Sequence, residues 1–222
     1  MTILISGDAA TNLSTYQGLR LSVADWLDRD DLTSRIPDFI RLAEAKFRRD
    51  LIMPDMETSI TITPAASVPL PVDFDSMRSL GIAGFPAMRQ RTPADFGALG
   101  VTPVGTPYTG LPTEFMIAAG TMSFWPTPDR TYSMTMLYRA NLPSLSTLTA
   151  SNWLLDKHPD AYLYATLLQA ELYGWNDARL PLIQTGLDEV MMSITMSGTR
   201  KRYGSGPLQM KTTVRQTCGG RI

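Results

Sequence analysis

The residue types that most often carry out catalysis are scarce in this sequence and lie far apart. His158 is the only histidine among the 222 residues, so a two-histidine metal site cannot form and a serine–histidine triad would have to use this residue. It stands directly before Pro159, where a helix cap or an exposed side chain is the simpler interpretation. Cys218 is the only cysteine, which excludes an intramolecular disulfide, and nothing around it is expected to activate its thiol. We therefore predict no catalytic, metal-binding or cofactor-binding residue.

Carboxylates are the other candidates for chemistry. Hydrolysis of a glycoside needs two acids on facing elements, roughly 5 to 9 Å apart. Glu44, Glu171, Asp188 or Glu189 could supply such a pair, which would make the protein a carboxylate-dependent cell-wall hydrolase. Solvated helix faces account for the same residues more simply, so the hydrolase remains the weakest alternative.

Positive charge is concentrated at the end of the chain. No acidic residue follows Glu189, and six basic residues do, so residues 190–222 carry a charge of +6. Since the net charge of the sequence is −1, residues 1–189 carry −7. A nucleic-acid-binding protein that uses this tail is a second alternative. Tyr203 is the only aromatic residue in the tail, which is little for a protein that stacks bases. The basic residues of the tail are Arg200, Lys201, Arg202, Lys211, Arg215 and Arg221.

Helical periodicity at both ends of the sequence predicts four helices. The first spans residues 14–29, with Ser14 and Gln17 as a capping box, and the second runs from residues 33–37 to Leu51 with Pro37 in its first turn. These two helices should form an antiparallel hairpin. A third helix begins near residues 156–159 and ends near Gly174, and a fourth follows and stops at Gly198.

Each predicted helix carries an apolar stripe at three- and four-residue steps, which should face the core. The methionines 191, 192 and 196 fit a core position, although they would also suit an adaptable interface. The stripes are Tyr16, Leu19, Val23, Trp26 and Leu27; Ile36, Phe39, Ile40, Ala43 and Phe47; Tyr162, Leu163, Thr166, Leu167, Ala170 and Tyr173; and Leu180, Ile183, Leu187, Val190, Met191 and Ile194.

Between residues 53 and 151 the apolar residues alternate, and most prolines fall in or beside this stretch, which predicts strands. Expected strands cover residues 57–63, 80–82 and 87–90. Residues 113–118, 121–125 and 131–138 should form a three-stranded meander, with Tyr132, Met134, Met136 and Tyr138 on its buried face. Residues 97–112 should be a long irregular loop.

These elements predict an α+β fold. Residues 1–52 and 152–198 should form a four-helix bundle from N- and C-terminal helical hairpins, and residues 53–151 a small inserted antiparallel β domain. Residues 199–222 contain too few apolar groups to repay their ordering, so we expect a flexible basic C-terminal arm that orders on binding. No apolar stretch approaches the roughly 20 residues needed to cross a bilayer, and we expect no contact with a membrane.

Several short strings follow one another in a definite order along residues 14–195. In this order and spacing they resemble the head-to-tail adaptor, or connector, proteins of tailed bacteriophages. The strings are VADWLDR at 23–29, IPDFIRLAEA at 36–45, RRDL at 48–51, LPVDF at 70–74, RSL at 78–80, TPADF at 92–96, PTPD at 126–129 and NWLL at 152–155.

The resemblance implies a structural protein of the virion neck, made in the bacterial cytoplasm and without catalytic residues or cofactors. It implies a ring of about twelve subunits that joins the portal protein to a tail or nozzle protein. Genomic DNA would pass through the ring without sequence-specific binding, and a C-terminal arm would dock on the portal. In this sequence the residues expected to form the portal-docking arm are Arg200, Lys201, Arg202, Tyr203, Lys211, Arg215 and Arg221.

Overall fold

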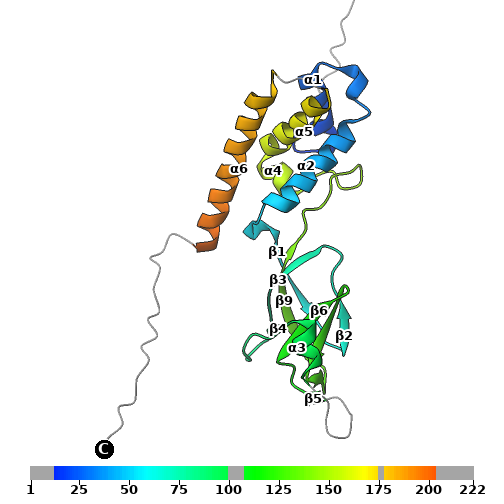
Figure 1. Cartoon of the computed structure of the whole chain (residues 1–222), viewed down its shortest axis with the longest axis vertical. Coiled ribbons are helices and arrows are strands. Elements are labelled where there is room, and N and C mark those ends of the chain that lie inside the picture. The colour runs from blue at the N-terminus through cyan, green and yellow to red at the C-terminus, as the bar shows by residue number, and fades with distance from the viewer. Residues whose placement is uncertain (1–12, 100–107, 175–177, 204–222) are drawn as a thin grey trace, which may run out of the picture.

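The computed structural model describes residues 13–99, 108–174 and 178–203, which form a mixed α+β protein. Helices from both ends of the chain gather at one end of the molecule, and the strands lie at the other (Figure 1). The helices are α1 (Tyr16–Leu27), α2 (Ile36–Asp50), α3 (Pro93–Gly97), α4 (Trp153–Lys157), α5 (Pro159–Gly174) and α6 (Leu180–Tyr203), with 3-10 helices η1 (Asp30–Leu32) and η2 (Pro54–Met56). The strands are β1 (Glu57–Ile62), β2 (Ser67–Pro69), β3 (Phe74–Ile82), β4 (Arg89–Arg91), β5 (Thr109–Gly110), β6 (Glu114–Ala118), β7 (Thr121–Trp125), β8 (Thr127–Pro128) and β9 (Met134–Ala140).

The first two helices occur where the sequence predicts them, but α1 is capped differently. Thr15, not Ser14, is the N-cap residue, because its extended backbone lets its hydroxyl accept a hydrogen bond from the Gly18 amide at 3.1 Å. The helix ends where Asp28 adopts a left-handed conformation. In α2, Pro37 occupies the first turn as predicted.

The predicted third helix is α5, which spans Pro159–Gly174 as expected, and the short helix α4 before it was not predicted. Asn152 caps α4 by accepting a hydrogen bond from the Leu155 amide at 3.0 Å, several residues before the predicted start. His158 ends α4 through its backbone amide, which donates to the Leu154 carbonyl, and α5 begins at Pro159. His158 is therefore a capping residue by its backbone, between two helices.

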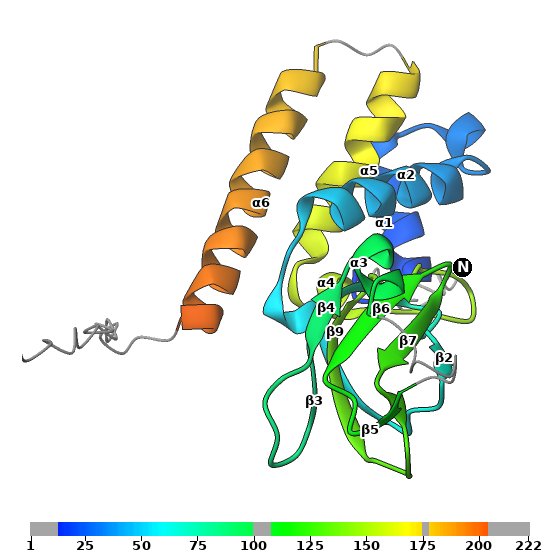
Figure 2. The same cartoon turned by 60° about the horizontal axis from the view of Figure 1, so that its bottom comes forward.

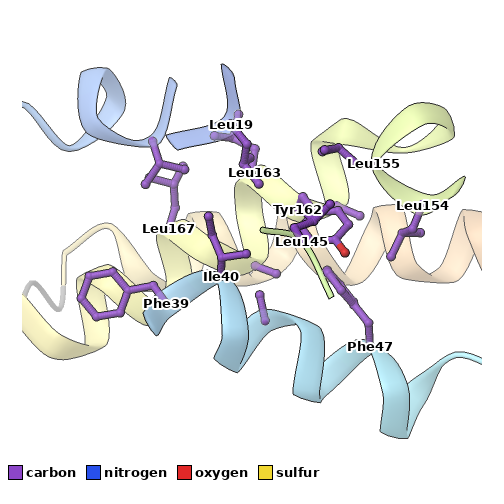
Figure 3. Close-up of a cluster of buried hydrophobic side chains, with 14 of the residues drawn as sticks. Leu19, Phe39, Ile40, Phe47, Leu145, Leu154, Leu155, Tyr162, Leu163 and Leu167 are labelled. Atoms are coloured by element: carbon purple, nitrogen blue, oxygen red, sulfur yellow. The ribbon is translucent and has the colours of Figure 1, made fainter. Parts of the chain in front are cut away.

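The helix α5 is the centre of the helical region, since α1, α2, α4 and α6 all contact it (Figure 2). Its side chains Tyr162, Leu163 and Leu167 meet residues from α1 and α2 in one cluster (Figure 3). The predicted stripes are largely buried, but Trp26 and Tyr173 are 46% and 55% exposed. Those two positions lie at the border of their stripes, so their exposure depends on neighbours that the sequence does not specify.

A buried polar network fixes the segment that returns from the strands to the helices. The buried Glu44 carboxylate accepts a hydrogen bond from the Leu145 amide at 2.7 Å and interacts with the hydroxyl of Tyr162. That hydroxyl accepts a hydrogen bond from Asn152 at 2.7 Å, and Asn152 also donates to the Pro143 carbonyl at 2.9 Å. Burial raises the pKa of Glu44 although its hydrogen bonds and Arg48 oppose the shift. One network thus joins α2, α5 and residues 143–152.

The strands form two main sheets, and their topology corrects two predictions. One sheet has the order β1-β9-β3 and is antiparallel, and the other has the order β2-β7-β6-β4, in which β4 runs parallel to β6. The small β5-β8 pair is also parallel, so the region is not purely antiparallel. The predicted meander is wrong beyond β7: residues 126–133 pass through β8, and β9 joins the other sheet between β1 and β3. The buried face of Tyr132, Met134, Met136 and Tyr138 is confirmed.

The two main sheets enclose a second apolar cluster, separate from that of the helices. Met134 and Met136 of β9 are almost fully buried in it, opposite Phe115 and Phe124 of the other sheet. Because the other sheet faces β9, its inward side chains are covered. We call residues 57–140 the sheet region. Residues 100–107, half of the predicted loop, lie outside the described residues.

The helix α6 does not stop at Gly198 but continues to Tyr203, so the predicted helix end and the start of the arm are wrong by five residues. A Cβ atom at position 198 would lie 2.5 Å from the sulfur of Met53, which precedes η2. Gly198 therefore allows α6 to pass close to Met53, and it does not end the helix. Lys201, in the next turn, forms an ion pair of 2.7 Å with Asp55 of η2. This contact orders residues that the sequence assigns to the arm.

The substitution Tyr162→Phe tests the buried network. Removing the hydroxyl takes one buried hydrogen-bond partner from each of Glu44 and Asn152, so the free energy of unfolding should fall by about 1–3 kcal/mol. Urea unfolding measures this loss. Tyr173→Phe, in the same helix but exposed, is the matched control and should change stability by less than about 0.5 kcal/mol. Equal effects of the two substitutions would show that the network does not hold the fold.

The raised pKa of Glu44 predicts a pH dependence. A carboxyl whose pKa is higher in the folded protein binds its proton more tightly there, so its contribution to stability is greatest below its ordinary pKa and declines as the pH rises through the raised value. The stability of the wild type relative to Glu44→Gln should therefore fall between acidic and neutral pH. Urea unfolding of both proteins over this range gives the difference, and parallel pH profiles would contradict the assignment.

The substitution Asp55→Asn tests the attachment of α6 to η2. Each partly exposed lysine pair is worth about 0.5–1 kcal/mol, so amide hydrogen exchange in residues 199–203 should rise about two- to fivefold. Residues 183–190 of the same helix serve as the internal reference and should not change. High salt should reduce the difference in exchange, because it screens the pairs in the wild type. Unchanged hydrogen exchange in the last turn at low salt would mean that the contact between Met53 and Gly198 is enough to hold α6 against η2.

Candidate interaction surfaces

The structure places the first basic residues of the tail together in the last turn of α6. Arg200, Lys201 and Arg202 are exposed there, and positive charge at a helix C-terminus is favourable. Arg200 and Arg202 have no ion-pair partner within the described parts of the chain, whereas Lys201 is held by Asp55. The side chain of Tyr203 and the residues Lys211, Arg215 and Arg221 lie outside the described residues.

Asp55 fixes the place from which the tail leaves. Its carboxylate pairs with Lys157 of α4 and with Lys201 of α6. Partial burial raises the pKa of Asp55, but hydrogen bonds from the two lysines and their charges outweigh it and hold the pKa below its usual value. The carboxyl is therefore ionised at neutral pH, and it joins the ends of two helices to η2, directly before β1.

A groove of about 450 Å³ runs between α2 and α6, and we call it the methionine groove. Met192 and Met196 are 60% and 49% exposed in it, so the expectation that these methionines belong to the core is wrong for both. The buried stripe of α6 contains Ile183, Leu187 and Ile194 instead. The groove is lined by Lys46, Asp50, Asp188, Met191, Met192, Thr195 and Met196.

A second groove, of about 400 Å³, lies between α6 and the helices α1 and α5, and we call it the tryptophan groove. Trp26 forms one wall and packs edge-on against Tyr164, with ring centroids 6.4 Å apart. Leu182 of α6 is 78% exposed at its rim. The helix α6 is thus bordered by two different apolar grooves, neither of which the sequence analysis identified.

The sheet region has an uncharged hollow of about 420 Å³ on the outer face of the β1-β9-β3 sheet. Ser59, Ser79 and Thr135 line its floor, and Leu137 and the exposed Phe85 add apolar surface. Interfaces between proteins are depleted of charge at their centres, so this face is suited to a protein partner. Strand alternation could have predicted the centre of this face, because Ser59 and Thr61 of β1 pair there with Leu137 and Thr135 of β9. The charged pair Glu57 and Arg139 lies at one end of the same face.

The four candidate catalytic carboxylates have structural surroundings. Glu44 belongs to the buried network, and Glu171 lies 3.1 Å from Arg179 in an ion pair without hydrogen-bond geometry. Asp188 accepts a hydrogen bond from Gln184 at 2.7 Å in the methionine groove. Glu189 lines the tryptophan groove. The four residues therefore divide among the core, an ion pair and two grooves rather than meeting in one cleft.

Residues 13–99, 108–174 and 178–203 lack two further kinds of feature. Within them, no three His, Cys, Asp or Glu side chains gather as a metal site would require. No helix in this part has the length and apolar character to span a membrane. Cys218 lies outside it.

Comparison with known protein families gives one match. Residues 14–211 match the family described as SU10 adaptor protein, and the match includes the helices, the sheet region and the first basic residues of the tail. A comparison with curated proteins gave no match. The family match confirms the resemblance to phage head-to-tail adaptors, which are structural components of the virion neck. This chain belongs to the SU10 adaptor protein family.

Proposed function

We propose that the protein is a ring subunit that connects the portal to the tail of a tailed bacteriophage. The observation that carries this proposal is the position of α6, which has an apolar groove on each side and the basic tail at its end. Single exposed apolar residues are ordinary on a monomer, but two grooves along one helix favour burial by other subunits. The family match supports the adaptor role itself.

Closure of a ring requires a heterologous contact, in which two different surfaces of neighbouring copies meet. The methionine and tryptophan grooves differ in shape and residue type, so they can serve as parts of two such surfaces. In this proposal α1, α2, α5 and α6 act as a four-helix bundle that packs beside the next one. The resemblance to connector proteins implies about twelve subunits in the ring and a channel for DNA through it.

The basic tail is the proposed contact with the portal. Arg200 and Arg202 begin it in the exposed last turn of α6, and Lys211, Arg215 and Arg221 continue it beyond the described residues. Since Lys201 pairs with Asp55, we assign it to holding the base of the arm rather than to the portal. Several arms on one ring would add avidity without any new kind of contact.

The sheet region is the proposed contact with the next tail or nozzle protein. It lies at the end of the molecule opposite the helices (Figure 1), and its outer hollow is uncharged. The surface that meets DNA need only be compatible with phosphate, because the genome passes through without base-specific contacts.

Ending the chain after Tyr203 tests the arm, because it preserves all of α6 and its pair with Asp55. Affinity for purified portal, measured by biolayer interferometry, should fall by about a hundredfold or more if ring avidity depends on the arms. A full-length control with Arg35, Arg41 and Arg49 changed to Gln removes three charges from the helical region and should bind normally. Electron microscopy of the same samples should show rings on the portal only with the intact arm.

Two results would contradict the proposal. Normal rings on the portal without residues 204–222 would exclude the arm as the docking element. Tight binding of duplex DNA with a steep dependence on salt, lost when Arg200 and Arg202 are neutralised, would favour the nucleic-acid-binding alternative.

A further inference from the structure

The methionine groove has the character of a binding site for a peptide segment. Two of its methionines are about half exposed, and methionine side chains adapt to different apolar partners. No described element of the chain covers it. Contiguous exposed apolar surface usually marks a binding site, so we expect this groove to be covered by another segment.

The rim of the groove carries a slight negative charge. Asp50 pairs with Lys46 at 3.3 Å, and Asp188 has no ion-pair partner in the described part of the chain. The three charges sum to −1, so a basic segment would complement the rim. Asp188 stands on α6 at the end of the groove away from Tyr203, and Met196 at the near end.

The chain leaves α6 close to this groove. Met196 is seven residues before the last residue of α6, which at 1.5 Å per residue places it about 10 Å from the helix end. The next residues are Gly204, Ser205, Gly206 and Pro207, the types that most often reverse the direction of a chain. Residues 208–215 could therefore run back along α6, and eight residues reach up to about 26 Å when extended.

Residues 208–215 also match the groove in chemistry. Leu208, Met210 and Val214 are apolar, and Lys211 and Arg215 are basic. The match to the adaptor family continues to residue 211, so it includes the beginning of this segment. The segment thus offers apolar groups for the methionines and positive charge for Asp188.

We propose that in the free protein the methionine groove binds residues 208–215 of the same chain. Leu208, Met210 and Val214 cover Met192 and Met196, and Lys211 or Arg215 pairs with Asp188. The same basic residues belong to the proposed portal contact, so binding to the portal removes the segment and uncovers the groove for a neighbouring subunit. This last step rests on the proposed function, whereas binding of the segment in the free protein does not.

The single cysteine makes a direct test possible with the full chain. A nitroxide on Cys218 broadens NMR signals of nearby methyl groups, and methionine methyls labelled with ¹³C report from the groove and from elsewhere. The signals of Met192 and Met196 should be lost, while that of the buried Met134 in the sheet region persists. Met88, also buried in the sheet region, is a second control for the distance dependence of the broadening.

Exchanging the charges of Asp188 and the tail separates specific binding of the segment from broadening caused only by its attachment to α6. Asp188→Lys should restore the signals of Met192 and Met196, and adding both Lys211→Glu and Arg215→Glu to it should remove them again. Persistence of the Met192 and Met196 signals in the wild type, or no response to the exchange, would overturn the proposal. Broadening that appears only between nitroxide-labelled and ¹³C-labelled chains in a mixture would assign the groove to the tail of a second copy and would also overturn it. Because no portal is present, these outcomes do not depend on the truncation experiment.

Discussion

The chain passes from the helices into the strands once and returns once, and both passages are held by a carboxylate. Glu44 and its partners Tyr162 and Asn152 hold the returning segment, and Asp55 holds the outgoing one beside the ends of α4 and α6. Burying Glu44 is costly unless its hydrogen bonds are satisfied, so the network requires one arrangement of α2, α5 and residues 143–152. These two points hold the connections between the helical cluster and the cluster of the sheet region.

The sequence predicted the helices best where burial is one-sided. Ile36, Phe39, Ile40 and Phe47 recur at helical spacing in α2, and all are buried. Prediction failed where a residue type has two uses. Glycine commonly ends helices, but Gly198 permits contact with Met53, a residue far away in the sequence. The position of β9 also depends on distant partners, because alternation along Met134–Ala140 shows which face is buried but not which strands lie beside it.

The candidate surfaces were predictable only in part. The basic residues of the tail are visible from charge alone, and the structure adds that Lys201 is engaged by Asp55 while Arg200 and Arg202 are exposed. The grooves beside α6 could not be predicted, because methionine and leucine at helical spacing fit the core equally well. The burial of Ile183, Leu187 and Ile194 sets the rotation of α6, and that rotation decides that Met192 and Leu182 face outward.

The junction of α6 with η2 has a mechanical consequence. The last turns of α6 rest on Met53 and Asp55, and β1 starts at Glu57, only two residues after Asp55. A pulling force on the end of α6 therefore reaches the sheet region through this short connection as well as through the helical core. Tension at one end of the molecule would then tilt the other end as a rigid piece, and the stiffness of that hinge would be set by one carboxylate and two lysines.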